Sequence, residues 1–134
     1  MEMRCAIYAR YSSDMQKPES IDDQIGECKR YIEKRGWHLL EDQVYNDFAI
    51  TSSDITREGY VRLKQAALQH RFDFIVVDDL SRLGRNTAES IQTFSELTFC
   101  GVNIASVADG IDTSQKGAKM PFYFKSIMNE FFSG

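Results

Sequence analysis

The sequence predicts a three-layer α/β domain with a mainly parallel sheet of four or five strands, flanked by helices. Short apolar runs of β-type residues alternate with segments of helical periodicity, a pattern typical of parallel sheets with crossover helices. The 134 residues fall within the usual size of one domain, and the 43% apolar content is enough to fill one core. We therefore expect one compact unit.

The first half of the chain alternates two strands with two helices. Residues 5–9 form an apolar run that predicts a buried strand, and residues 38–45 predict a second strand. A helix between them is indicated by four apolar residues at helical spacing, behind the capping pair Ser20 and Asp23: Ile21, Ile25, Cys28 and Ile32. Residues 46–56 are polar and aperiodic, which predicts a loop, and residues 57–70 predict the second helix, with Tyr60, Leu63 and Ala67 on one side.

The second half repeats the alternation. Residues 72–77 are the strongest strand pattern in the chain, so we expect this strand at the centre of the sheet. Asn86 and Glu89 form a capping pattern that opens a helix to about Phe99, which Gly101 ends before a strand at 102–107. We place the α/β domain at residues 1–118.

Residues 119–134 predict the start of a further helix, apolar on more than one side. Such a helix needs a partner beyond its own domain, although a core helix can also be apolar all round. The chain ends within it or just after it, with no zinc or helix-turn-helix pattern of the kind found in DNA-binding regions, so we expect a truncated piece of a longer chain.

Composition limits the location and the partners. No apolar run approaches the roughly 20 residues that span a bilayer, and the charged start lacks a signal-peptide pattern, so we expect a cytoplasmic protein with no membrane partner. The 16 basic and 20 acidic residues argue against binding nucleic acid through bulk charge, so a DNA-binding role must depend on a local arginine cluster. The three cysteines are far apart in sequence, which favours buried free thiols.

Polar residues follow the first strand, where ligands bind in open α/β sheets. They are Arg10, Ser12, Ser13 and Gln16. The same residue types also form ordinary turns, so this stretch alone leaves a surface turn as an alternative.

A second polar stretch follows the expected central strand and contains Arg82 and Arg85, three residues apart, just before a helix N-terminus. Guanidinium groups bind phosphate bidentately and stay charged, so the pair is a candidate phosphate clamp, unless both are simply solvated. Arg57, after the predicted loop, is weak evidence alone because it could pair with a surface carboxylate.

Taken together, the blocks Tyr8-Ala9-Arg10-x-Ser12, Arg57-Glu58-Gly59 and Leu80-Ser81-Arg82-Leu83-Gly84-Arg85 resemble the signature blocks of the resolvase/invertase serine recombinases. Their order and intervals match over nearly the whole chain. The resemblance implies a DNA recombinase catalytic domain in which Ser12 attacks the scissile phosphate, leaving a 5′-phosphoserine link and a free 3′-hydroxyl.

The resemblance also implies the roles of the other residues. Arg10, Arg82 and Arg85 contact the phosphate and help to activate Ser12, Arg57 reaches in from the end of the loop, and Gln16 and Gln24 support the site. No metal and no small-molecule cofactor are implied. The partners implied are double-stranded DNA and further copies of the chain, as a dimer and then a synaptic tetramer whose contacts involve the terminal helix.

Two positions depart from the simplest pattern. Ser81 stands where small resolvases carry Asp, which points to the branch of large serine integrases and transposases. Ser13 is a second candidate nucleophile, although the offset of Ser12 from Arg10 matches the family. The rival hypotheses are a non-catalytic dimerisation or regulatory module with the same fold and a flavodoxin-like small-molecule enzyme, which would need glycines after the first strand.

Overall fold

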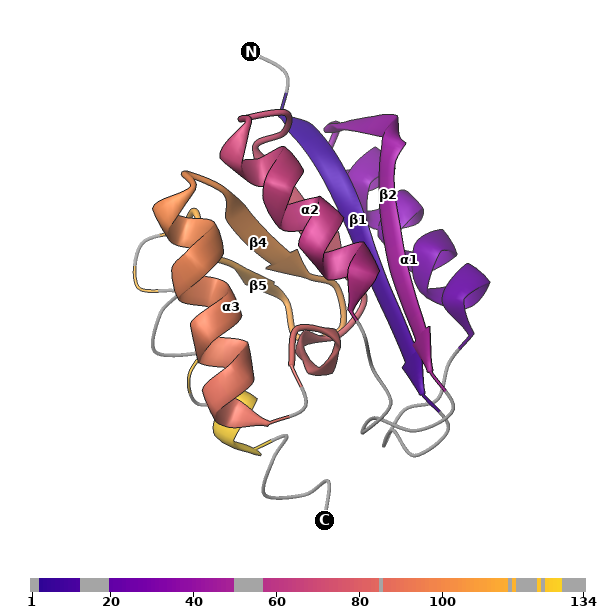
Figure 1. Ribbon diagram of the computed structural model, residues 1–134. Helices are drawn as coiled ribbons and strands as arrows, with labels where there is room; N and C mark the ends of the chain where they lie inside the picture. Colours follow the sequence, from indigo (N-terminus) through magenta and orange to yellow (C-terminus); the bar gives the residue numbers. More distant parts are fainter. Residues whose placement is uncertain are drawn as a thin grey trace.

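The computed structural model describes residues 3–12, 20–49, 57–84, 86–115, 117, 123 and 125–128, apart from the side chains of Ser12 and Ala49. Within these ranges a five-stranded sheet has the order β2-β1-β3-β4-β5 (Figure 1). Its strands are β1 Arg4–Ser12, β2 His38–Ala49, β3 Phe74–Val77, β4 Asn103–Ser106 and β5 Ile111–Asp112. All neighbours pair in parallel except β4 and β5, so the prediction of a mainly parallel sheet with a central third strand is confirmed.

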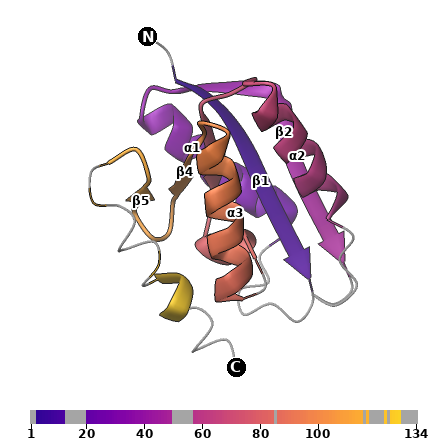
Figure 2. The ribbon, with the colours of Figure 1, turned by 60° about the vertical axis from the view of Figure 1, so that its left-hand side comes forward.

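Three helices cover the two faces of the sheet. Helix α1, Ile21–Lys34, lies on one face, and α2, Glu58–Leu68, and α3, Thr87–Phe99, lie on the other (Figures 1 and 2). A short 3-10 helix, η2, spans Leu80–Arg82 between β3 and α3. This arrangement gives the three layers that the sequence predicts.

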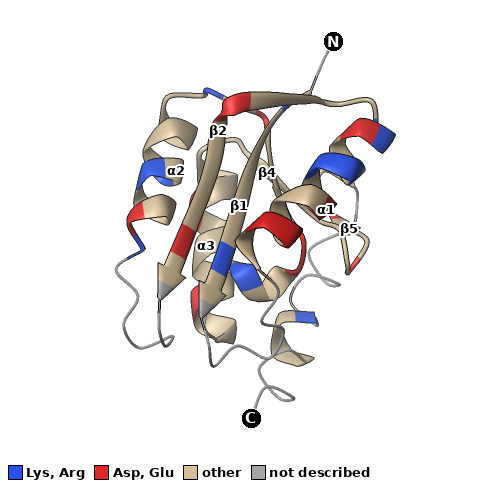
Figure 3. Ribbon diagram, turned by 90° about the vertical axis from the view of Figure 1, so that its right-hand side faces the viewer, with Lys and Arg blue, Asp and Glu red and all other residues tan. Residues whose placement is uncertain are grey.

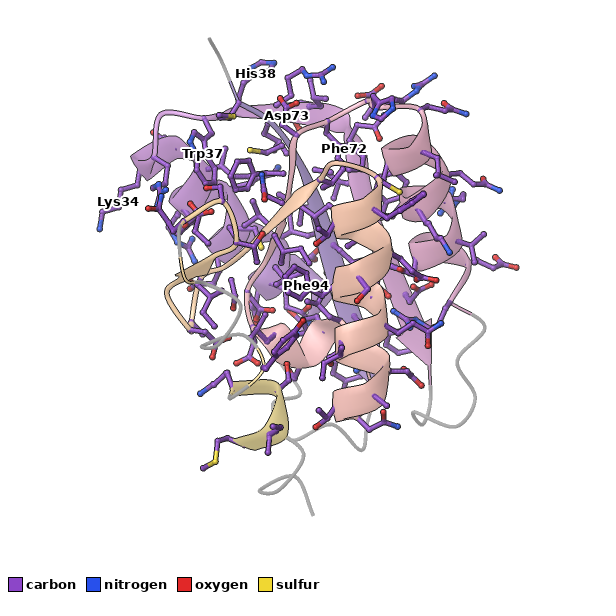
Figure 4. All side chains as sticks on the ribbon, turned by 90° about the vertical axis from the view of Figure 1, so that its left-hand side faces the viewer. Lys34, Trp37, His38, Phe72, Asp73 and Phe94 are labelled. Carbon is purple, nitrogen blue, oxygen red and sulfur yellow. The ribbon has the colours of Figure 1, made fainter. Side chains whose placement is uncertain are left out.

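The alternation of side chains along β1 divides the core between the faces. Cys5 and Ile7 pack with α1, whereas Ala6 and Tyr8 pack with α2 and α3. Figure 4 shows Phe94 pointing from α3 into the space between the helix and the sheet, where it is 5% exposed. The three cysteines are free and buried, as predicted.

Two helix starts follow the predicted capping patterns. The Ser20 side chain accepts a hydrogen bond from the Asp23 amide at 3.1 Å, and the Asn86 side chain accepts one from the Glu89 amide at 2.9 Å. Each cap satisfies a backbone amide that the first turn of a helix leaves without a partner.

Strand β2 differs from the prediction. We expected residues 46–56 to be a loop, but β2 continues to Ala49, because residues 44–49 pair in parallel with residues 7–12 of β1. The polar composition of residues 46–49 does not predict a strand. These residues are extended because their backbone forms hydrogen bonds with β1. Residues 50–56 lie outside the described part of the chain.

The predicted terminal helix is described only at Tyr123 and at residues 125–128, where the backbone is helical. Tyr123 packs against Phe94 with ring centroids 5.9 Å apart, and the Thr87 hydroxyl donates to the Ser126 carbonyl at 3.1 Å. The rest of the predicted helix lies outside the described residues. Among the residues that are described, no helix has the length and apolar character needed to cross a membrane.

Candidate active site

The candidate site lies where the carboxyl ends of β1 and β3 meet. The chain runs from β1 to β2 on one side of the sheet and from β3 to β4 on the other side. The strand order therefore reverses between β1 and β3. Open α/β sheets bind ligands in the crevice at such a point. The predicted site residues Arg10 and Ser12 end β1, and Ser81 and Arg82 follow β3.

Arg10 is the centre of the described site. Its Nη2 donates to two carbonyls of the turn at residues 81–84. These are the carbonyl of Ser81 at 2.7 Å and that of Gly84 at 3.2 Å. The residue is 2% exposed, and its Nε and Nη1 are buried with no hydrogen-bond partner among the described residues. Two unsatisfied N–H-bearing atoms on one buried guanidinium are costly and mark a position that an oxyanion could fill.

The charges around Arg10 add to this cost. Burial lowers the pKa of Arg10, and the nearby cations Arg57 and Arg82 lower it further, while Tyr8 and Glu89 act in the opposite direction. Three guanidinium groups therefore act on one buried position, and an anion bound there would relieve their mutual repulsion.

Gln24 holds the backbone of Arg10 from the opposite face of the sheet. Its Oε1 accepts from the Arg10 amide at 2.9 Å, and its Nε2 donates to the Arg10 carbonyl at 3.0 Å. Gln24 is fully buried in α1, and both hydrogen bonds fix the position of the Arg10 backbone. Its supporting role in a reaction stays a prediction.

Arg82 is also buried, at 0% exposure, and its Nε and Nη2 bind Asp78 at 2.8 and 3.1 Å. Its Nη1 donates to the Arg10 carbonyl at 3.4 Å. The bidentate contact with Asp78 fixes this guanidinium against the backbone of β1, so in this structure Arg82 positions Arg10. The predicted contact of Arg82 with a phosphate remains a prediction.

The turn of residues 81–84 is tightly packed on α3. A Cβ added to Gly84 would lie 2.6 Å from the Ser90 amide nitrogen and 2.7 Å from the Glu89 Cβ, so only glycine fits this approach. The Ser81 amide donates to the Asp79 carboxylate at 2.9 Å, and the buried Ser81 Oγ makes no hydrogen bond to a described residue. Ser81 thus contributes its carbonyl to Arg10.

Arg57 joins the site from the start of α2. Its Nη2 donates to the Leu83 carbonyl at 3.3 Å, its Nη1 lies 3.6 Å from a Glu89 carboxylate oxygen, and its guanidinium lies 4.3 Å from the centre of the Tyr60 ring. Arg57 itself has a left-handed backbone, with φ of 56°. The structure therefore brings Arg10, Arg57 and Arg82 together around one turn, as the three sequence blocks predict.

Asp47 of β2 is a site residue that the sequence reasoning missed. Its Oδ1 accepts from the Gly59 amide at 2.7 Å, and its Oδ2 accepts from the Tyr60 amide at 3.0 Å and from the Tyr8 hydroxyl. Asp47 caps α2 in place of Arg57, whose side chain makes no capping bond. It pairs with Arg10 in the strand register, and Figure 3 shows basic and acidic positions of β1 and β2 side by side near their carboxyl ends.

The Arg57-Glu58-Gly59 block has a physical explanation in the same contact. A Cβ on Gly59 would lie 2.1 Å from the backbone oxygen of Asn46, so α2 can meet β2 only with glycine here. The sequence signal for Asp47 was strand alternation, which places Asp47 and Tyr45 on the same face of β2. The prediction of a loop at residues 46–56 excluded this signal.

Several predicted site residues cannot be placed. The backbone of Ser12 ends β1 and pairs with Ala49, but its side chain lies outside the description. Ser13, Gln16 and Arg85 lie outside the described residues altogether. Among the described residues there is no group of three or more His, Cys, Asp or Glu side chains that could hold a metal ion.

The fold and the site define an α/β domain in which three arginines, Arg10, Arg57 and Arg82, gather at the carboxyl edge of the sheet. The family model described as "Resolvase, N terminal domain" matches residues 5–133, and the chain belongs to this family.

The curated relatives agree with this membership. A protein named "Resolvase/recombinase" from Pseudomonas putida is 35% identical over 118 residues, which cover 88% of this chain and 59% of the relative. The "Transposon Tn3 resolvase" of Escherichia coli is 35% identical over 111 residues, covering 83% of this chain and 54% of the relative. The chain therefore spans a little over half the length of these relatives.

Solved structures share the fold. The N-terminal catalytic domain of TP901-1 integrase superposes with a TM-score of 0.77 at 28% identity, covering 96% of this chain and 95% of that one. The C-terminal catalytic domain of ISC1926 TnpA, an IS607-like serine recombinase, has a TM-score of 0.62 at 27% identity and covers 78% and 70% of the two chains. A resolvase family site-specific recombinase from Streptococcus pneumoniae, at 21% identity and a TM-score of 0.72, covering 92% and 84%, adds support for the fold alone.

Proposed function

We propose that this chain is the catalytic domain of a site-specific serine recombinase, which cuts and rejoins double-stranded DNA through Ser12. The observation that carries the proposal is the buried guanidinium of Arg10, which lies two residues before Ser12 in β1. Within the described part of the chain, its Nε and Nη1 have no hydrogen-bond partner. The relatives that are named resolvase, recombinase and serine recombinase support the same reaction class.

The proposed chemistry is two successive phosphoryl transfers. The Ser12 Oγ attacks the scissile phosphorus in line and loses its proton, while the bond from phosphorus to the 3′ oxygen breaks and that oxygen leaves as a 3′-hydroxyl. DNA then carries a 5′-phosphoserine link. Attack by a 3′-hydroxyl reverses the step, so no energy-rich cofactor is consumed.

Guanidinium charge is the proposed source of transition-state stabilisation. The phosphorus gains negative charge on its non-bridging oxygens as Ser12 attacks, and donors held in a dry site stabilise that charge strongly. Arg10 has two donor atoms, and Arg57 has a buried Nε, that make no hydrogen bond to any residue that the structure describes. Arg82 keeps Arg10 in place, Arg85 and Gln16 complete the proposed set, Gln24 and Ser81 support it, and Ser13 is the minor candidate nucleophile.

The proposal includes self-association and DNA as partners, with a dimer that pairs into a tetramer through the helix predicted at residues 119–134. It places the parent in the large integrase and transposase branch, on the evidence of Ser81. The chain itself carries more acidic than basic residues. We therefore expect weak, salt-sensitive DNA binding by the domain alone.

The test joins residues 1–134 to a heterologous DNA-binding domain and supplies DNA with two sites for that domain flanking a central step. Samples quenched with detergent are examined for covalent protein–DNA adducts. We expect adducts that Ser12→Ala abolishes and that EDTA leaves intact. Arg10→Lys should lower the rate by about 100-fold or more, because an ammonium group cannot replace the forked guanidinium contacts.

The matched control is Arg30→Lys, since Arg30 lies on the exposed side of α1 and pairs only with Glu27 among the described contacts. This variant should form adducts at the parental rate. A fusion that binds DNA and assembles but forms no adduct would overturn the proposal in favour of the non-catalytic module.

A further inference from the structure

Asp109, in the connection between β4 and β5, is a buried carboxylate that the proposed reaction does not use. Its side chain is 2% exposed. Oδ2 accepts from the Leu80 amide at 3.0 Å and from the Ser106 hydroxyl at 2.6 Å, and Oδ1 lies 3.3 Å from the Lys125 ammonium. Each contact comes from a different part of the chain.

The Leu80 contact leads directly to the candidate site. Leu80 is the first residue of η2, and the next residue, Ser81, provides the carbonyl that Arg10 binds at 2.7 Å. The connection that carries Asp109 is itself fixed beside β3, because the Val107 and Ala108 amides donate to the carbonyls of Val77 and Asp78 at 3.0 and 2.8 Å. Asp109 is thus a rigid support for the start of the turn.

The Lys125 contact leads to the C-terminal segment. The Lys125 side chain is 45% exposed, so this half of the link can be broken without opening the core. The Asp109 Oδ1 is buried and accepts no hydrogen bond from the described residues, so the Lys125 ammonium group, 3.3 Å away, is its compensating charge. Removing that charge leaves a buried carboxylate oxygen uncompensated, which favours rearrangement of the groups that Asp109 holds.

We infer that Asp109 is a positioning residue that couples the segment 123–128 to the turn that binds Arg10. When Lys125 contacts Asp109, the carboxylate holds the Leu80 amide and the turn keeps its carbonyls on Arg10. When the segment moves away, this support weakens. The structural half of the inference concerns contacts alone, and its catalytic consequence rests on the proposed function.

The structural half is tested by amide hydrogen exchange, read by NMR in residues 1–134. Asp109→Ala should speed exchange of the Leu80 amide by about tenfold or more, since a hydrogen bond to a charged acceptor is lost. Lys125→Met removes only the exposed partner, so it should leave the fold intact and still speed Leu80 exchange by about threefold or more.

The matched control is Lys64→Met, because the Lys64 side chain has an exposure similar to that of Lys125 and forms an ion pair with Glu96 at 2.8 Å, between α2 and α3. It should leave Leu80 exchange unchanged. Equal Leu80 exchange in the parent and in Lys125→Met would overturn the coupling, whatever the protein's reaction.

The catalytic half is tested in the fusion that forms adducts. Lys125→Met should lower the maximal rate of adduct formation without changing the DNA concentration for half-saturation, whereas Lys64→Met should change neither. A merely structural role would leave the maximal rate unchanged at temperatures well below unfolding. If the parental fusion forms no adduct, the proposed function fails. The hydrogen-exchange experiment still determines whether Lys125 stabilises the contact of Asp109 with the Leu80 amide.

Discussion

Arg82 and Asp78 form a bidentate ion pair inside the protein, with distances of 2.8 and 3.1 Å and side-chain exposures of 0% and 6%. The same guanidinium donates to the Arg10 carbonyl. One buried pair therefore joins the end of β3, the start of the turn at residues 81–84 and the backbone of β1. Its partners are four residues apart, so the pair also fixes η2 locally.

Asp78→Asn should destabilise the protein by about 3–5 kcal/mol, because breaking a buried pair leaves an uncompensated charge. Urea unfolding followed by circular dichroism measures this. Glu27→Gln breaks an exposed pair with Arg30 and should cost about 0.5 kcal/mol or less. Equal effects of the two substitutions would show that the Asp78 pair has no structural role.

Gln24→Met should cost about 1–3 kcal/mol, because a side chain of similar size leaves the buried Arg10 amide without its acceptor. Exchange of the Arg10 amide should rise together with the fall in unfolding free energy. Gln65→Met changes an exposed glutamine of α2 and should stay within about 0.5 kcal/mol of the parent. Slow exchange of the Arg10 amide in Gln24→Met, as in the parent, would contradict the role of Gln24 in holding the Arg10 backbone.

Gly59→Ala should cost about 3 kcal/mol or more, because its Cβ would lie 2.1 Å from the Asn46 carbonyl oxygen. Gly26→Ala is the opposite case. Its Cβ would have only ordinary contacts, the nearest 3.6 Å away, so helix propensity should make this variant about 0.5–1 kcal/mol more stable. Thermal unfolding of both variants checks the signs, and a stable Gly59→Ala would refute the close approach of α2 to β2.

The Arg4 side chain lowers the pKa of Asp73 through a hydrogen bond, with further lowering from the Arg4 amide and its charge, against the effect of burial. A lowered folded-state pKa stabilises the protein above the unfolded value of about 4, and this contribution is lost as the pH falls through the folded value. Asp73→Asn should therefore be less stable than the parent at pH 7, with the gap closing below pH 4. A gap that widens on acidification would contradict this sign.

The strands and helices with clear periods were predictable from sequence. Ser20 and Asn86 cap the helices that the capping patterns indicate, and residues 72–77 gave the central strand. Sequence periodicity failed at β2, because pairing with β1 decides that residues 46–49 are extended, and such pairing is not a local property.

The sequence predicted that Arg10, Arg57 and Arg82 would lie near one another, but it did not predict the contacts of each. The sequence placed Arg82 with the phosphate-binding groups, whereas the structure pairs it with Asp78, which the sequence reasoning did not single out. Asp47 and Asp109 were missed for a related reason. Their importance comes from contacts 12 to 39 residues away along the chain, which no short motif records.

Mass spectrometry of the DNA adduct formed by the fusion, after protease and nuclease digestion, tests the central claim most directly, because it identifies the residue that carries the nucleotide. We predict a phosphodiester link to Ser12 within the tryptic peptide of residues 11–29, since Pro18 blocks cleavage after Lys17, and the same site in a Ser13→Ala variant. An adduct on any other residue would contradict the assignment of Ser12 as the nucleophile.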